Sequence, residues 1–326
     1  MEAAAVRSFL KKYWFLTGLI LVSGLTVADR SETVAQVGRW LQAHRGPDLV
    51  IFAIFFFSGT ALQTEQVRSG LSDWRATATA LAVIFVVSPL WALALGRLPL
   101  HPGLMIGLFL VAAMPTTLSS GVVMTGAAGG NMANALMITL LANFSAIFTV
   151  PVVLTFLVGD AAGAAGVLIN KTALMVKMAK LVALPLGLGI LVRPTFQGVY
   201  KRRGINPNVV NGCFILAIVW IAVSKSRPTI VSGLHLLPSV VLLVAGFHLG
   251  LLAAAAALGR VLRLGRGRVE SVLFMGSQKT LPLSVLIQTA LFPQYGEALV
   301  FCVCHHVIHL IMDGYLVGRL QTGRKE

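Results

Sequence analysis

The chain has 326 residues, of which 57% are hydrophobic and only 11% are charged, and its mean hydropathy is +0.86. Soluble domains carry a charge on about a quarter of their residues, so most of this surface must face something other than water. The formal net charge is +15, but the basic residues lie in short runs between apolar segments. A nucleic-acid partner would require these charges on one water-exposed face, so the composition excludes that class and predicts a polytopic membrane protein.

Ten apolar segments are interpreted as membrane spans, since a helix crosses the hydrocarbon core with about 20 mostly apolar residues. In chain order they cover residues 13–28, 49–62, 76–95, 103–125, 132–158, 167–192, 209–224, 234–258, 271–292 and 298–320. The predicted fold class is therefore all-α. We interpret the first segment as a retained helix, although Thr26-Val27-Ala28 loosely resembles a signal cleavage site.

The loops between the spans differ in their content of basic residues. If the N-terminus is cytoplasmic, the runs at 201–203 and 260–268 fall on the cytoplasmic side, whereas the opposite side has scattered residues such as Arg97. Cytoplasmic loops carry the excess of Lys and Arg in membrane proteins. We therefore expect both termini in the cytoplasm and an even number of spans.

The fourth and ninth spans are interrupted by polar residues and helix breakers near the middle of the membrane. Pro115 precedes a polar run at 116–121, and Gly276 and Pro282 flank the polar segment 277–280. Irregular backbone at this depth is tolerated only where it is buried in protein or lines a cavity. Interruptions at corresponding positions of two halves indicate the binding site of a secondary transporter.

The two interruptions occupy equivalent places in the chain, because each lies in the next-to-last of five spans. Thr117, Leu118 and Val122 have the same spacing as Thr280, Leu281 and Val285. Five is an odd number, so two such halves must lie inverted relative to one another in the membrane. We therefore predict one inverted repeat in residues 1–160 and the other in residues 161–326.

Three motifs make the chain resemble the bile acid:sodium symporter family, in its divergent prokaryotic-type branch. They read AMPTTLSSGVVMTGAAGGN, KLVALPLGLGILVRP and LFMGSQKTLPLSVLI. The resemblance implies ten helices in two inverted repeats, with a panel and a core domain each built from both repeats. It implies that discontinuous helices 4 and 9 cross in the core. It further implies alternating-access transport of a small organic anion, usually driven by sodium, in the plasma membrane, here a bacterial inner membrane.

The sodium ligands that the resemblance implies are only partly present. The position of a ninth-helix glutamate is Phe274 and that of an asparagine is Lys279, whereas Gln278, Ser120 and Thr139 match the family pattern. Hard cations require several oxygen ligands, with carboxylates preferred. We therefore expect at most one weak, residual sodium site, formed by Ser120, Thr139 and Gln278, and no other cofactor.

Lys279 lies near the middle of the ninth span, where a lysine costs several kcal/mol. Snorkelling to an interface is disfavoured by this depth. We hypothesise that its ammonium takes the place of a sodium ion at the helix crossing. There it would either neutralise the anion or titrate during transport.

The predicted substrate-binding groups cluster around the two interruptions. They are Thr116, Thr117, Ser119, Asn134, Ser277, Lys279, Thr280 and His305. The alternatives are that the hydroxyl groups bond only to their own helices and that Asn134 links helices. His305, His309 and Asp313 share one helix face, which leaves helix packing, a proton pathway and a metal site open.

These features favour a secondary transporter of a small organic anion that uses the lipid bilayer as its solvent. The alternative is a membrane protein that regulates calcium or ion homeostasis without moving an organic solute. An intramembrane enzyme would need a nucleophile–base pair or a complete metal site at one depth, and neither occurs, so we predict no enzymatic activity. The sequence indicates neither the solute nor the oligomeric state.

Overall fold

The computed structural model describes residues 2–62, 73–161 and 169–322, with only the backbone course given for 2–13 and 160–161. This part of the chain consists of helices and connecting segments without any strand, which confirms the all-α prediction for it. The helices are α1 (Glu2–Ala28), α2 (Thr33–Ala43), α3 (Gly46–Ala61), α5 (Trp74–Ala82), η1 (Val83–Val87), α6 (Ser88–Leu95), α7 (Pro102–Ala113), α8 (Ser120–Ala127), α9 (Met132–Ala161), α10 (Lys171–Met178), η2 (Ala179–Ala183), α11 (Leu184–Arg203), α12 (Pro207–Ser232), η3 (Leu234–Leu236), α13 (Leu237–Val261), α14 (Arg268–Ser277), α15 (Leu281–Leu291) and α16 (Gly296–Thr322).

Six helical segments in this part are long and apolar enough to cross a membrane. They are Trp74–Leu95, Met132–Gly159, Lys171–Arg203, Pro207–Ser232, Leu234–Val261 and Gly296–Thr322, and Trp14–Ala28, Gly46–Ala61 and Pro102–Ala113 are shorter apolar helices. The protein is therefore a multi-pass membrane protein. The count of ten spans and the division near residue 160 stay predictions. Residue 167, given above as the start of the sixth predicted span, lies outside the described residues.

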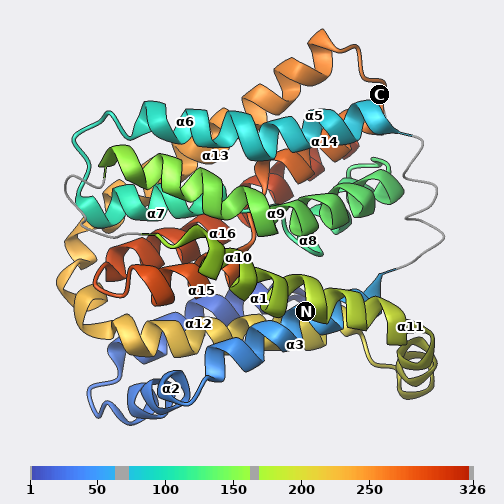
Figure 1. Cartoon of the computed structure of the whole chain (residues 1–326). Coiled ribbons are helices and arrows are strands. Elements are labelled where there is room, and N and C mark those ends of the chain that lie inside the picture. The colour runs from blue at the N-terminus through green and yellow to red at the C-terminus, as the bar shows by residue number, and fades with distance from the viewer. Residues whose placement is uncertain (1, 63–72, 162–168, 323–326) are drawn as a thin grey trace.

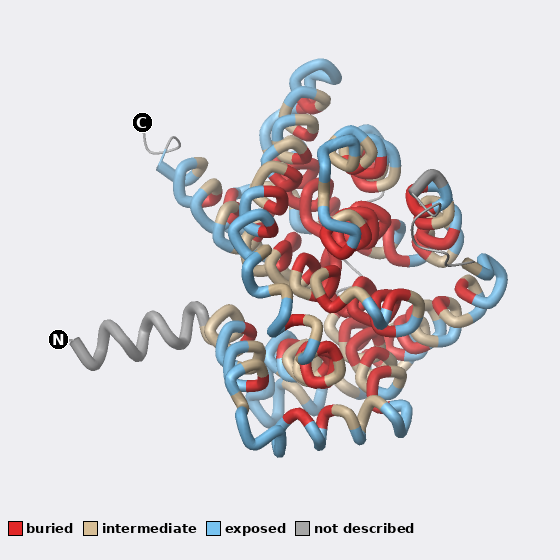
Figure 2. The backbone as a smooth tube through the Cα atoms, turned by 90° about the vertical axis from the view of Figure 1, so that its left-hand side faces the viewer, coloured by how far each residue is buried: buried red, intermediate tan, exposed pale blue. Residues whose placement is uncertain are grey.

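The helices pack in two groups, as Figure 1 shows. Helices α1, α2, α3, α10–α11 and α12 contact one another in the smaller group, and α5–α9 with α13–α16 form the larger one. The groups touch mainly where α12 meets α15 and α16, and where α9 meets α10. In the end-on view of Figure 2, buried residues concentrate inside the groups and exposed residues cover the outside. Leu191, Leu242 and Phe148 are among the exposed apolar side chains, which suits contact with lipid.

Helix α2 is short and has a different pattern from the spans. Val34, Val37 and Trp40 are exposed, while Ala35 and Gly38 are buried against the neighbouring helices. A Cβ atom at Gly38 would collide with the Ser224 side chain of α12, so the glycine allows the two helices to approach closely. An apolar face with Trp beside basic residues is typical of a helix that lies in the membrane interface.

Two apolar segments are not continuous helices. Helix α7 ends at Ala113 and α8 begins at Ser120, and α14 ends at Ser277 and α15 begins at Leu281. The first gap contains Pro115, which lacks a backbone N–H group, and Pro282 occupies the first turn of α15, where that loss costs nothing.

The helix before α6 contains a third irregularity, the π-helical turn η1. The N–H group of Ser88 bonds to the carbonyl oxygen of Val83, five residues earlier. The next acceptor in this register is Ile84, but its donor would be Pro89, which has no N–H group. The Ile84 carbonyl oxygen therefore has no partner within its own helix.

The close contact of α3 with α11 yields a stability prediction. A Cβ atom at Gly189 would collide with the Phe56 carbonyl oxygen, whereas one at Gly187 on the same helix would meet no atom within 4 Å. We expect Gly189→Ala to lower the free energy of unfolding by roughly 1–3 kcal/mol, because the helices must separate. Gly187→Ala serves as the control, and thermal unfolding in detergent is the measurement. Equal stability of the two variants would contradict this packing.

Candidate functional site

The two helix interruptions are joined by a hydrogen bond between their backbones. The Thr280 N–H group donates to the carbonyl oxygen of Pro115 at 2.9 Å. Consecutive residues in the second gap then direct their side chains to different neighbours: Gln278 contacts α8 and α16, Lys279 contacts α7 and η1, and Thr280 lines a cavity. The gap between α7 and α8 therefore contacts the gap between α14 and α15 through non-helical backbone, and we call this place the junction.

Lys279 is 1% exposed, and its ammonium is held by main-chain oxygen atoms. Its Nζ donates to the carbonyl groups of Ile84 at 2.9 Å, Met114 at 3.0 Å and Ala112 at 3.3 Å. No described carboxylate lies within ion-pair distance of it. The cation is thus compensated by carbonyl dipoles alone.

The local backbone explains why each of these three oxygen atoms lacks a partner in its own helix. The Ile84 carbonyl group has no helical donor because of the π-turn and Pro89. Ala112 and Met114 lie at the C-terminal end of α7, where carbonyl groups have no intrahelical partner and the helix dipole is negative. The Ala112 oxygen also accepts from the Ser88 hydroxyl at 3.0 Å. Proline at two positions and a helix end therefore create a site that suits one monovalent cation.

Gln278 connects the cavity wall to the protein interior. Its Oε1 accepts from the hydroxyl groups of Thr117 and Ser120, each at 2.8 Å. Its Nε2 donates to Asp313 Oδ2 on α16 at 2.7 Å and lies 3.2 Å from Met124 Sδ. Both ends of the amide are occupied, and the side chain is fully buried. The orientation of this amide therefore depends on an acceptor at Asp313.

Asp313 is the centre of a buried group of imidazoles. Its Oδ1 lies 2.9 Å from His248 Nε2 of α13, and its Oδ2 lies 4.0 Å from His309 Nδ1. His309 Nε2 is 3.0 Å from His306 Nδ1, and His306 stacks edge-on against Phe15 with ring centroids 5.8 Å apart. Within the described residues, no cluster of His, Cys, Asp and Glu side chains is arranged to hold a metal ion.

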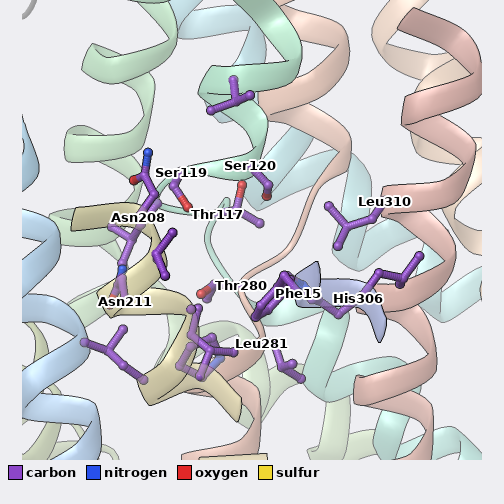
Figure 3. A pocket seen from close by; sticks show the side chains of 18 of the residues that line it. Phe15, Thr117, Ser119, Ser120, Asn208, Asn211, Thr280, Leu281, His306 and Leu310 are labelled. Atoms are coloured by element: carbon purple, nitrogen blue, oxygen red, sulfur yellow. The ribbon is translucent and has the colours of Figure 1, made fainter. Parts of the chain in front are cut away.

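A cavity of about 340 Å³ lies at the junction, between the two groups of helices. Figure 3 shows Thr117, Ser119 and Ser120 at the top of the cavity, Asn208 and Asn211 beside them at the left, and Phe15, His306 and Leu310 at the right. Its lining is Trp14, Phe15, Leu16, Ile54, Thr117, Leu118, Ser119, Ser120, Val123, Met124, Asn206, Asn208, Val209, Asn211, Gly212, Ile215, Thr280, Leu281, Pro282, His306 and Leu310. A larger groove of about 430 Å³ between α1, α12, α13 and α16 has almost only apolar lining, so nothing there orients a polar ligand.

The electrostatics of the cavity suit a negative group. None of the described residues that line it is acidic. The N-termini of α8 and α15 both begin at its wall, and helix N-termini present N–H groups and positive dipole ends. Hydroxyl groups and the amides of Asn208 and Asn211 add further hydrogen-bond donors. The aromatic and aliphatic side chains of α1 and α12 form the apolar remainder.

Four of the predicted site residues lie together at this cavity, namely Thr117, Ser119, Ser120 and Thr280. Gln278 lies directly behind them and holds the Thr117 and Ser120 hydroxyl groups.

Other predicted residues lie close to the junction but bond elsewhere. Lys279 points to the carbonyl groups described above and is absent from the cavity lining. The hydroxyl groups of Ser277 and Thr139 donate to Leu273 and Ala135 on their own helices. Thr139 therefore does not direct its hydroxyl toward Ser120 and Gln278.

Three predicted residues lie in the interior away from the cavity lining. Asn134 donates to Thr77 Oγ1 at 2.8 Å and to the Asp73 carbonyl group, and so links α9 to α5. Thr116 is fully buried with an unpartnered hydroxyl oxygen. The His305 ring packs against Phe247 and two other imidazoles, and its Nε2 has no partner.

Several residues of the site were not predicted. Asn208 and Asn211 belong to a segment with three asparagines, residues 206–211, at the start of an apolar helix, which was a usable signal. Phe15 and His248 gave no signal, because a lone aromatic or a lone histidine in an apolar helix acquires a role only through its tertiary neighbours.

A family model matches residues 13–322, which is nearly the whole chain, and it describes the SBF-like CPA transporter family. The chain belongs to this family. The match confirms the family predicted from the motifs, and it covers both interruptions, α1 and α12, and therefore every element of the cavity.

This chain covers 71% to 95% of the length of three relatives that it matches. A probable sodium/metabolite cotransporter, BASS4, of Arabidopsis thaliana chloroplasts is 30% identical over 92% of this chain and 71% of its own. The sodium/bile acid cotransporter 7-B of Xenopus laevis is 24% identical over 96% of this chain and 93% of its own. An uncharacterized protein of Pseudomonas aeruginosa is 27% identical over 98% of this chain and 95% of its own. The named relatives are cotransporters, which agrees with a non-enzymatic role.

The contacts of Lys279 predict a stability loss on substitution. Lys279→Met removes the only donor of the Ile84 and Met114 carbonyl oxygens in the described structure, and also removes the cost of burying a charge. We expect a net loss of about 2 kcal/mol of unfolding free energy, because unpartnered buried carbonyl groups cost more than is regained. Lys180→Met, at an exposed position of another span, is the matched control in thermal unfolding. A Lys279→Met protein as stable as wild type would show that these carbonyl groups do not depend on the ammonium.

Proposed function

We propose that the protein is a secondary transporter that moves a small organic anion by alternating access. The anion binds in the cavity where α7–α8 and α14–α15 meet. The observation that carries this proposal is the cavity itself, with donors and two helix N-termini on one wall, apolar side chains on the other, and no acidic lining residue among those described. Interrupted helices at corresponding positions of two halves are typical of such sites.

The lining favours an anion with an apolar body. The carboxylate or similar group would accept from the hydroxyl groups of Thr117, Ser119 and Ser120, and the body would pack against Trp14 and Phe15. A volume of about 340 Å³ accommodates a small molecule rather than a peptide. The relatives named as metabolite and bile acid cotransporters are consistent with this class of solute.

Lys279 takes the place of a sodium ion at the junction. Its ammonium is coordinated by main-chain oxygens as a bound cation would be, and it faces away from the cavity, so its role is a fixed charge and not a direct ligand of the anion. The residual sodium site of Ser120, Thr139 and Gln278 has weak support. Gln278 Oε1 already accepts two hydroxyl groups, and Thr139 bonds to its own helix.

The two groups of helices correspond to the panel and core domains of a ten-span inverted repeat. The panel consists of α1–α3 and α10–α12, and the core of α5–α9 and α13–α16. Movement of one against the other would open the cavity to either side in turn.

The described conformation has the features of an inward-facing state. The cavity is lined by the α12 start at Asn206 and Asn208, next to the basic run 201–203 that we place in the cytoplasm. At the other end of α12, Lys225 donates to the Thr289 carbonyl group of α15 and thereby closes the space between panel and core. The proposed location is a bacterial inner membrane with cytoplasmic termini.

Anion binding is tested by thermal stabilisation of the purified protein with a panel of bile acids, dicarboxylates, keto acids and aromatic carboxylates, followed by uptake into proteoliposomes. We expect at least one anion to raise the unfolding temperature of wild type. Thr117→Ala should weaken its affinity by about tenfold, because one buried hydrogen bond is lost.

Thr149→Ala is the control, since that hydroxyl group bonds only within α9. The transport proposal is wrong if no anion of the panel stabilises or crosses the membrane. The proposed site is wrong if Thr117→Ala and Thr149→Ala bind the anion equally well.

A further inference from the structure

A carboxylate and several imidazoles lie together behind the cavity wall, away from water. Asp313, His248 and His309 are each 0% exposed, and His306 is 5% exposed. Ionisable groups at membrane depth are costly and are usually part of a substrate, ion or proton pathway. Helix packing alone would be better served by apolar side chains of similar size.

The Asp313–His248 pair has room for one more proton. His248 Nε2 lies at hydrogen-bond distance from Asp313 Oδ1, and its Nδ1 is buried without a partner. A neutral imidazole has one N–H group and one bare nitrogen, so this arrangement fits a neutral ring that donates to an ionised carboxylate. A proton added to the pair gives either a carboxylic acid or an imidazolium, and both are held by the same hydrogen bond.

A chain of rings connects this pair to the cavity. His306 lines the cavity and lies 3.0 Å from His309, and His309 Nδ1 lies 4.0 Å from Asp313 Oδ2. The last distance is longer than a hydrogen bond, so a small rotation of the His309 ring completes the path. Every member belongs to α13 or α16.

Gln278 links the pair to the anion-binding hydroxyl groups. Its Nε2 donates to Asp313 Oδ2, and its Oε1 accepts from Thr117 and Ser120. When Oδ2 carries the proton it becomes a hydrogen-bond donor, which favours an amide that turns its Oε1 toward Asp313. Rotation of the amide takes Oε1 away from Thr117 and Ser120 and leaves their hydroxyl groups free to donate to an anion.

We propose that Asp313 and His248 bind one exchangeable proton that enters from the cavity along His306 and His309, and that Gln278 couples this proton to the anion site. One proton, which carries one positive charge, is taken up from the side to which the cavity is open. It is released after the cavity has opened to the other side, with no change of oxidation state. The coupling of this proton to an anion rests on the function proposed above, whereas proton binding itself does not.

Other charged groups around the pair are limited in the described structure. On α16, His305 lies beside His248 and His309, and the fixed ammonium of Lys279 is near enough to act electrostatically on His305. Helices α7, α8 and α15, which also pack against α16, contain no titratable side chain. The charged groups of α12, which also packs against α16, bond elsewhere: Lys225 donates to the Thr289 carbonyl group and Arg227 to Glu32, while Glu297, at the start of α16, lies beside Gly103 and Gly233.

Infrared spectroscopy of the protein in lipid nanodiscs tests proton binding directly. The probe is the proton, titrated between about pH 5 and about pH 8, the range in which imidazole–carboxylate groups exchange protons. We expect a carbonyl stretch of a protonated carboxyl group or an imidazolium ring band to appear on acidification of wild type and to be absent in Asp313→Asn. His248→Gln should move the midpoint measurably, because the ring that shares the added proton with Asp313 is lost. Asp48→Asn, at a half-exposed acid of α3, should leave the titration unchanged.

If Asp313→Asn does not fold, wild-type protein labelled with ¹³C at the aspartate carboxyl group serves instead. The isotope then identifies an aspartate that changes its protonation or its hydrogen bonding over this range. A spectrum that is the same in wild type and Asp313→Asn at every pH, or a labelled aspartate band that does not change, would overturn the proton site.

Coupling to the cavity is tested by the rate of maleimide labelling of Ser119→Cys in a Cys213→Ser background, which removes the exposed native thiol. Dividing this rate by that of the same protein carrying Asp313→Asn cancels the pH dependence of the thiol. We expect the ratio to change by about fivefold across the infrared midpoint. A constant ratio would overturn the coupling by Gln278. If no anion of the panel binds or crosses the membrane but wild type shows a clear proton titration, anion transport is contradicted and the proton site is retained.

Discussion

The ammonium of Lys279 among the Ile84, Ala112 and Met114 carbonyl groups is the contact on which the rest of the site depends. A buried cation must be solvated by the protein, and here the C-terminal end of α7 and the π-turn before α6 supply the oxygen atoms. This contact fixes the second gap against the first. Its two neighbours in the sequence are then held in place, Gln278 against α8 and α16 and Thr280 at the cavity.

The charged side chains of the junction, Lys279 and Asp313, do not line the cavity in which the anion is proposed to bind. The positive side chain faces one side of the junction, the carboxylate of Asp313 lies on another, and the cavity between the helix groups presents neutral donors. An anion in the cavity would therefore meet hydroxyl groups and helix N-termini, with the ammonium acting from behind through the low-dielectric interior. Gln278 is the one described side chain that contacts both the hydroxyl groups and the acid, which is why the coupling of proton and anion is assigned to it.

Part of the fold and of the site was predictable from residues that are close together in the sequence. Pro115 and Pro282 indicated where the helices end, and the family followed from motifs around them. The direction of Lys279 was not predictable, because its partners come from residues about 195 and 165 positions away and one is freed only by the π-turn. The role of Asn134 depended on Thr77, 57 residues earlier in the chain, and that of Thr139 on a rotamer that bonds to its own helix. His248 gave no signal, since its partner Asp313 is 65 residues further along the chain.

The most direct test of the central claim compares the unfolding temperature of wild type in sodium chloride and in potassium chloride at equal ionic strength, with Lys279→Met measured beside it. If the ammonium occupies the cation position at the junction, wild type should unfold at the same temperature in both salts. Lys279→Met should then gain stability in sodium, because the vacated carbonyl groups recruit the ion. Sodium-specific stabilisation of wild type that persists unchanged in Lys279→Met would contradict the claim, because the ion would then bind elsewhere and the lysine would not replace it.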